Sequence, residues 1–90
     1  MVYVDALFIA KGGREWCHMS ADTLEELHAF ALGIDVPRCW YHGARKGHPH
    51  YDLSPERRKK AVAAGAKEVS AFEFVRLMRR LYGCDTNRFG

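Results

Sequence analysis

Hydrophobic residues near the start of the chain are spaced as in β-strands. Residues 2–10 are rich in β-branched and aromatic side chains and predict a strand that is buried on both faces, although Asp5 interrupts it. An acid in such a run lies either at a strand end that faces a cleft or bonded to nearby backbone, because an unpaired buried carboxylate is costly. The glycine turn that follows predicts a hairpin with a second strand at residues 15–19.

Alternation within the second strand divides its side chains between two faces. Trp16 and His18 share one face, and Cys17 and Met19 share the other. The sequence therefore places His18 beside an aromatic ring. A lone histidine on a strand is either a structural hydrogen-bond donor or a ligand, and the sequence leaves both roles open.

Three later segments have apolar residues three or four positions apart, which is the spacing of helices that pack one face on a core. Each begins after a residue type that caps helix N-termini and ends at a glycine. The predicted N-caps are Asp22, Ser54 and Ser70, and the terminal glycines are Gly33, Gly65 and Gly83. Acids in the first turn, such as Glu25 and Glu73, form capping boxes or arrangements close to them.

Two shorter strands are predicted at residues 38–42 and 66–69, the second of them after a helix and a glycine, as in α/β units. We therefore expect an α/β fold, with a small mixed sheet, an N-terminal hairpin and about three helices packed on the sheet. Ninety residues are enough for one domain and exclude a second. We expect the domain to span residues 1–83, followed by a flexible C-terminal tail at residues 84–90.

The charge is mildly basic and unevenly distributed. Fourteen lysines and arginines against eleven acids give a net charge of +3, and the sequence pI is about 8.9. One basic block covers residues 57–60, and a second contains Arg76, Arg79, Arg80 and Arg88. The C-terminal half therefore either presents a positive surface to phosphates or carries two solvated helix faces.

Cysteine usage and the N-terminus bear on the location of the protein. The three cysteines are widely spaced and odd in number, which argues against a secreted disulfide scaffold, and no pair has the spacing of a structural zinc site. The N-terminus lacks the pattern of a signal peptide, and no apolar stretch is long enough to span a membrane. We expect a cytoplasmic protein with no membrane partner.

The most distinctive polar run is His-Pro-His-Tyr-Asp at residues 48–52. In an extended chain its histidines and its aspartate project to one side, and imidazole and carboxylate are ligands of zinc and other divalent cations. One short strand supplies at most two or three ligands, so Asp5, His18 or His42 would have to complete a site. If a metal is bound, the expected ligands are Asp5, His18, His50 and Asp52. No cofactor is favoured, however, and the alternative is that Asp52 helps to cap the next helix.

The order of several motifs resembles that of a known family. The motifs are Val2-Tyr3-Val4-Asp5, Trp16-Cys17-His18-Met19, Glu26-Leu27-His28-Ala29-Phe30-Ala31, His50-Tyr51-Asp52-Leu53 and a final Ala64-Gly65-Ala66. Over roughly residues 2–80 they resemble a small uncharacterised family found in bacteriophages and actinobacteria, domain of unknown function four-zero-three-one. The resemblance implies a phage or bacterial origin and carries no activity. The residues it singles out include Asp5, His18, Asp22, His28, Trp40, His50 and Asp52.

Two functional classes follow from these residues. The favoured class is a small accessory protein that binds a phosphate-containing ligand, a nucleotide or a nucleic acid, in a cleft of histidine, aspartate and aromatic side chains. The expected ligand-binding residues are Asp5, His18, His28, Arg38, Trp40, His50, Tyr51, Asp52 and Arg57. The alternative class is a hydrolase of phosphodiesters that depends on a divalent metal, with His18, His28 or His50 as acid or base.

A structural alternative remains beside both classes. In it, His28, His50 and Asp52 form a buried network that ties the first helix to the sheet, and the protein acts through an interface with a host protein. A homodimer is also expected, because the hairpin and a small sheet leave strand edges exposed. Taken together, the residues favour binding over catalysis.

Overall fold

The computed structural model describes residues 1–9, 11–43 and 48–83, which form a mixed β-sheet and three α-helices. The strands are β1 (Val2–Val4), β2 (Phe8–Ile9), β3 (Glu15–Ala21), β4 (Tyr41–His42), β5 (His50–Leu53) and β6 (Lys67–Glu68). The helices are α1 (Leu24–Gly33), α2 (Pro55–Ala63) and α3 (Ala71–Tyr82), with 3₁₀ turns η1 (Lys11–Gly13) and η2 (Arg38–Trp40). The α/β prediction is confirmed, and the tail predicted at residues 84–90 lies outside the described residues.

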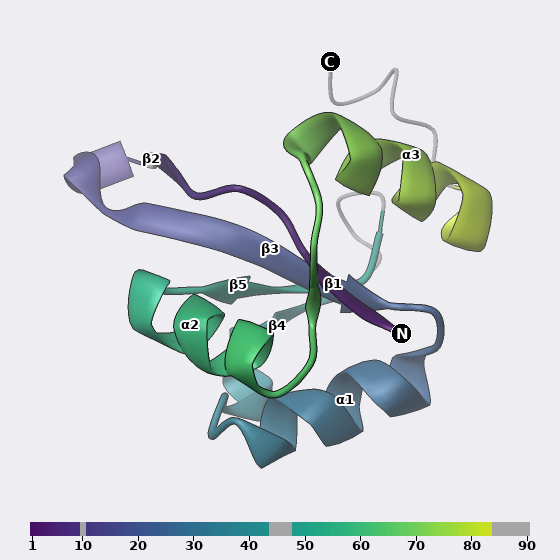
Figure 1. The fold of residues 1–90 in the computed structure, drawn as a ribbon, viewed down its shortest axis with the longest axis horizontal. Helices are drawn as coiled ribbons and strands as arrows, with labels where there is room; N and C mark the ends of the chain where they lie inside the picture. The colour runs from purple at the N-terminus through teal and green to yellow at the C-terminus, as the bar shows by residue number, and fades with distance from the viewer. Residues whose placement is uncertain (10, 44–47, 84–90) are drawn as a thin grey trace.

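The main path of the sheet has the order β4-β5-β3-β1-β6, and β2 pairs with the outer end of β3. The pairs β1–β3, β3–β5 and β4–β5 are antiparallel, whereas β6 runs parallel to β1. Strand β2 and the start of β3 project from the body of the sheet as the predicted hairpin (Figure 1). Among the described helices, none combines the length and the apolar character that crossing a membrane requires.

Helices α1 and α2 cover one face of the sheet (Figure 1). Alternate strand residues point into this layer, so Cys17, Met19, Tyr51 and Leu53 are buried there together with Leu27 of α1. Burial of such apolar surface contributes about 25 cal/mol per Å² to folding and makes this layer the main core. The division of β3 side chains between two faces is confirmed.

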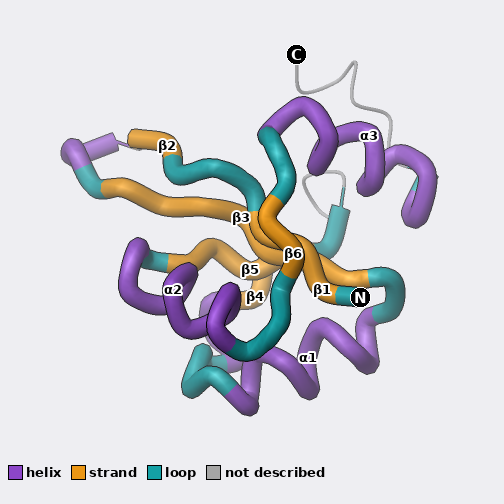
Figure 2. Tube along the Cα trace, in the orientation of Figure 1, coloured by secondary structure: helices purple, strands orange, loops and turns teal. Residues whose placement is uncertain are grey.

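Helix α3 lies on the opposite face and covers only part of it (Figures 1 and 2). Its contact is a narrow stripe in which Phe74 and Met78 are buried beside Val69. Two residues that helical spacing predicts to point inward, Val75 and Leu81, are 42% and 36% exposed, because they lie outside this stripe. The rest of the face, over β3, β5 and β4, carries a mixture of polar and aromatic side chains.

The strand predicted at residues 2–10 is divided at Asp5. Its carboxylate Oδ1 accepts the backbone N–H of His18 at 2.6 Å. A side chain thus takes the donor that a continuous strand would pair with backbone, so β1 ends at Val4. The following β2 is exposed, with Phe8 at 39% and Ile9 at 74%, and the prediction of burial on both faces is wrong there.

Local capping explains where the helices begin. The N-cap of α1 is Thr23, whose hydroxyl accepts the backbone N–H of Glu26 at 3.1 Å, and not Asp22 as predicted. The reason is that the Asp22 carboxylate accepts a hydrogen bond from the N-terminal amino group at 3.3 Å. The predicted caps Ser54 and Ser70 are confirmed. The strand predicted at residues 38–42 is shorter, because η2 replaces its first three residues.

Candidate functional site

A row of histidines and aspartates crosses neighbouring strands on the partly open face of the sheet. His42 comes from β4, His50 and Asp52 from β5, His18 from β3 and Asp5 from the end of β1. The sheet register places His18 opposite Asp52 and His42 opposite His50. Because side chains alternate along a strand, all of these residues lie on the face away from α1 and α2. We call this set the His–Asp cluster.

Three members of the cluster have the arrangement of metal ligands. One ligand atom each from His18, His50 and Asp52 lies within 4.8 Å of the others. Nε2 of His50 lies 3.4 Å from Oδ1 of Asp52. Ligand atoms around a tetrahedral zinc ion with bonds of about 2.0–2.1 Å lie roughly 3.3 Å apart. The spacing therefore fits a divalent cation after small side-chain movements.

The histidines of this triad are oriented by hydrogen bonds on their other ring nitrogens. Nδ1 of His18 lies 2.7 Å from Oδ2 of Asp5, and Nδ1 of His50 lies 3.0 Å from the backbone carbonyl of His48. A carboxylate and a carbonyl can only accept, so both Nδ1 atoms carry the proton. In the neutral rings Nε2 is then the atom with a free lone pair. Such outer partners are characteristic of histidines that bind metals.

The electrostatics of the cluster favour a positive charge between the two aspartates. Burial lowers the pKa of His18, but the hydrogen bond that its ring donates to Asp5 and the charges of Asp5 and Asp52 outweigh it and raise this pKa above its ordinary value. Burial also raises the pKa of Asp52, yet the interactions with His50, His42 and His18 prevail and lower it. The Asp52 carboxylate is therefore ionised at neutral pH.

His48 lies beside the cluster and differs from the other histidines. Its ring centroid is 4.8 Å from that of His50 and 6.3 Å from that of His18. Burial, followed by the charges of these two neighbours, lowers the pKa of His48 to about 4. Its buried Nδ1 has no hydrogen-bond partner among the described residues. His48 is therefore neutral at pH 7 and adds no positive charge.

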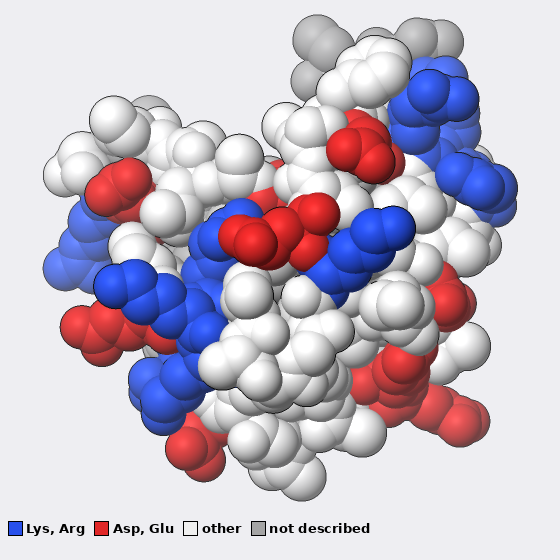
Figure 3. Space-filling model, in the orientation of Figure 1, with Lys and Arg blue, Asp and Glu red and all other residues white. Residues whose placement is uncertain are grey.

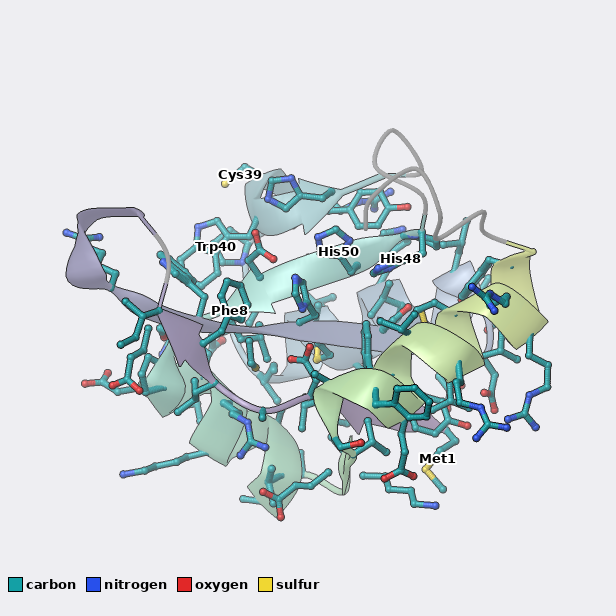
Figure 4. The ribbon with its side chains drawn as sticks, turned by 90° about the horizontal axis from the view of Figure 1, so that it is seen from above. Met1, Phe8, Cys39, Trp40, His48 and His50 are labelled. Carbon is teal, nitrogen blue, oxygen red and sulfur yellow. The ribbon has the colours of Figure 1, made fainter. Side chains whose placement is uncertain are left out.

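Aromatic rings border the cluster on two sides. The His18 ring is stacked between Phe8, at 4.9 Å, and Phe74 of α3, at 5.8 Å. Trp16 and Trp40 meet edge to face at 6.4 Å and are both partly exposed. Figure 4 shows Phe8 and Trp40 beside His50 on this face. These rings fix the orientation of the His18 imidazole and provide a surface for planar groups.

Two predicted ligand-binding residues lie on the opposite face of the sheet. Nδ1 of His28, on α1, lies 2.8 Å from the hydroxyl oxygen of the buried Tyr51. Tyr51 alternates with His50 and Asp52 along β5, so it points into the α1 layer while they point away from it. The proposed network of His28, His50 and Asp52 is therefore not formed, and that hypothesis is wrong.

The predicted arginines also lie apart from the cluster centre. Arg38 is exposed and stacks over the Tyr41 ring at 5.7 Å. Arg57 is in the first turn of α2, and its buried Nε has no partner among the described residues. Sequence reasoning missed Arg58, whose Nε donates to the backbone carbonyl of Asp5 at 2.9 Å. Nothing in the basic run at residues 57–60 distinguishes this arginine from its neighbours.

Comparison with known proteins identifies a family and adds no activity. The model of a family described as proteins of unknown function, DUF4031, matches residues 2–81. No curated protein and no solved structure matches the chain. The family match covers all the described strands and almost all of α3, and it confirms the resemblance inferred from the motifs. The chain belongs to DUF4031, a family of proteins of unknown function.

Proposed function

We propose that the protein binds a divalent transition-metal ion through His18, His50 and Asp52 and uses it to hydrolyse phosphodiesters. The observation that carries this proposal is the convergence of three ligand atoms within 4.8 Å. Both imidazoles are oriented by acceptors on Nδ1, at 2.7 and 3.0 Å. Acceptors on Nδ1 are the outer partners that metal-binding histidines usually have.

The donor set selects the class of metal. Two imidazoles and one carboxylate suit zinc, iron, cobalt or manganese better than magnesium or calcium, which prefer oxygen ligands. Three protein ligands leave at least one coordination position for water, as in catalytic zinc sites. A bound metal lowers the pKa of that water to about 7, so that hydroxide is present at neutral pH.

The metal also explains how an acidic cluster accepts a phosphate. Without a cation, the carboxylates of Asp5 and Asp52 repel an anionic ligand. A divalent ion held by His18, His50 and Asp52 would offset this charge, and it would supply a Lewis acid for a phosphate oxygen and an activated water for attack on phosphorus. In such a hydrolysis the oxygen of the water forms the new bond to phosphorus, the bond to the ester oxygen breaks, and the leaving oxygen takes up a proton from water. The phosphate-containing ligand expected from the sequence is thus compatible with the site once a cation is bound.

A second candidate is a binding protein without catalysis. It is favoured by Trp16 and Trp40, whose partly exposed rings meet at 6.4 Å beside the cluster and offer a surface for a nucleobase. The same metal would then hold the phosphate without cleaving it. A host-protein partner, a homodimer and a cytoplasmic location stay predictions.

Calorimetric titration with zinc tests the metal site directly. We expect one ion per chain, and Asp52→Asn should weaken binding by more than the roughly 10- to 100-fold that loss of an outer partner costs. His28→Asn is the control, because it removes an imidazole from the opposite face of the sheet. Zinc binding that is absent, or that survives both His50→Ala and Asp52→Asn, would refute the proposal.

Hydrolysis is tested separately with bis(p-nitrophenyl) phosphate as substrate. The reaction should require added metal, stop in EDTA and be lost in Asp52→Asn while His28→Asn keeps it. If metal binds but neither this diester nor an oligonucleotide is cleaved, the second candidate replaces the hydrolase.

A further inference from the structure

A basic groove lies between α3 and the edge of the sheet formed by β6. It has a volume of about 370 Å³ and is lined by the cations Lys67, Arg76 and Arg80, by Glu73 and by apolar side chains that include Leu77. A second hollow of about 330 Å³ adjoins it along the same arginines. Figure 3 shows lysine and arginine side chains gathered over α3. We call the first hollow the α3 groove.

The positive charge of the α3 groove is not neutralised by neighbouring acids. Within the described residues, Lys67, Arg76 and Arg80 take part in no ion pair. The nearby Glu68 carboxylate accepts from Arg58 at 2.9 Å. Glu73 is the capping-box acid of α3, and its backbone N–H and carboxylate both interact with the N-cap serine. Three cations therefore face one acid, which is the charge pattern of an anion-binding surface.

Repulsion between the arginines of the α3 groove also favours the binding of an anion there. Arg76 and Arg80 are four residues apart on α3, so their side chains are neighbours on one side of the helix. Like charges at this spacing destabilise a helix, and an anion between them reverses the effect. Consecutive phosphates of a nucleic acid backbone supply such anions in a row.

An exposed aromatic ring accompanies the cations. Phe72 is 70% exposed on α3, and the Arg76 guanidinium lies 5.7 Å from the centre of its ring. A basic groove beside an exposed aromatic and arginine pair is the combination that binds single strands, because the cations follow the backbone and the ring stacks on a base. Duplex nucleic acid does not offer free base faces to such a ring.

We propose that the α3 groove binds a single-stranded nucleic acid, with phosphates at Lys67, Arg76 and Arg80 and a base stacked on Phe72. Helix α3 joins this groove to the His–Asp cluster, since its Phe74 stacks on His18 at 5.8 Å. The inference deepens the proposed function by naming a single strand as the substrate class. It rests on that function for cleavage, whereas binding in the groove is tested independently.

Fluorescence anisotropy of the full chain with a labelled oligothymidylate in EDTA tests binding without cleavage. Each phosphate contact with a single strand contributes about 0.7 to the slope of log K against log salt. Loss of two contacts in Arg76→Gln with Arg80→Gln should therefore lower the slope by about 1.4 and the affinity about 25-fold at 0.1 M salt. Phe72→Ala should weaken binding without changing the slope.

The matched control is Lys59→Gln with Lys60→Gln, which removes the same charge from exposed positions on α2. It should weaken binding by less than about threefold. If the two double variants weaken oligonucleotide binding equally, the proposal that the strand binds in the α3 groove is wrong. Binding to anionic lipid vesicles or to a polyglutamate peptide through Arg76 and Arg80, with no binding to the oligonucleotide, would also overturn it.

Zinc titration of the double variants separates this inference from the proposed function. The Arg76→Gln with Arg80→Gln protein should bind zinc as the unsubstituted protein does, because both positions lie outside the metal ligands. If this double variant binds zinc but no longer binds the oligonucleotide, the result supports the α3 groove as the binding site of the strand. Absence of zinc binding in the unsubstituted protein would overturn the metal proposal alone.

Discussion

Asp5→Asn separates metal binding from folding better than substitution of a ligand. Asp5 is 3% exposed, and its two carboxylate oxygens accept from the backbone N–H and from Nδ1 of His18, at 2.6 and 2.7 Å. The asparagine carbonyl can still accept the backbone N–H, but its amide group then faces Nδ1 and can only donate. The ring must therefore move its proton to Nε2, and the lone pair that would bind the metal is lost.

Asp5→Asn should lower metal affinity more than it lowers folding stability. Loss of a carboxylate that orients a ligand histidine typically costs 10- to 100-fold in metal affinity, which is about 1.4–2.7 kcal/mol. Folding should suffer less, because both hydrogen bonds are retained in neutral form. A neutral hydrogen bond contributes about 1 kcal/mol less than one to a charged group, and removing a buried charge offsets part of this loss. We expect zinc affinity to fall strongly and the free energy of unfolding to fall by about 1 kcal/mol.

Three measurements test this expectation. Long-range ¹⁵N–¹H spectra of the metal-free protein report the tautomer of His18, calorimetry reports zinc affinity, and urea denaturation reports stability. The control is Asp35→Asn, which removes a carboxylate whose side chain is 80% exposed, at a positive-φ position that asparagine tolerates. If Asp5→Asn leaves the proton on Nδ1 and the zinc affinity unchanged, the role assigned to Asp5 is wrong.

The remaining predictions concern other parts of the molecule. The pKa of His48 is lowered from 6.5 to about 4, so its contribution to stability should be complete above pH 6.5 and lost as pH falls towards 4. Measured by urea denaturation, the free energy of unfolding of His48→Asn should therefore depend less on pH between these values than that of the unsubstituted protein. Burial raises the pKa of Cys17 to about 12, so in a Cys84→Ser background DTNB should label exposed Cys39 in the native protein and both thiols only after denaturation. Rapid labelling of two native thiols would contradict this. The buried Ser20 hydroxyl donates to a backbone carbonyl at 2.7 Å, so Ser20→Ala should cost about 1–3 kcal/mol in urea, and no measurable loss would show that water replaces the bond.

Local signals in the sequence were sufficient for most of the fold. The serines that begin α2 and α3 cap these helices as predicted, because capping depends on residues within one turn. The cap of α1 was misassigned by one residue, since Asp22 is bound by the N-terminal amino group, which lies far away in sequence. The break at Asp5 was recognised as an interruption, and of the two situations considered for it the bond to nearby backbone is confirmed, at the end of β1.

The candidate site depended on information that no local pattern contains. Alternation predicted that His50 and Asp52 share a face, because they belong to one strand. The pairing of β3 with β5 is what places His18 opposite Asp52, and a shift of one residue would have turned His18 to the core. The sequence also does not say which face of β5 packs against α1. His28 was therefore grouped with His50 and Asp52, although it contacts Tyr51 on the other face of that strand.

The hydrogen-bond pattern itself argues for a cation in the cluster rather than a neutral structural network. The backbone carbonyl that accepts from Nδ1 of His50 leaves Nε2 of the neutral ring as an acceptor. That atom lies 3.4 Å from Oδ1 of Asp52, which is also an acceptor, and the carboxylate is held in its ionised form. Two acceptors at this distance repel each other unless a positive charge lies between them. The proposed metal ion would supply that charge and would also satisfy Nε2 of His18, for which no hydrogen bond exists within the described residues.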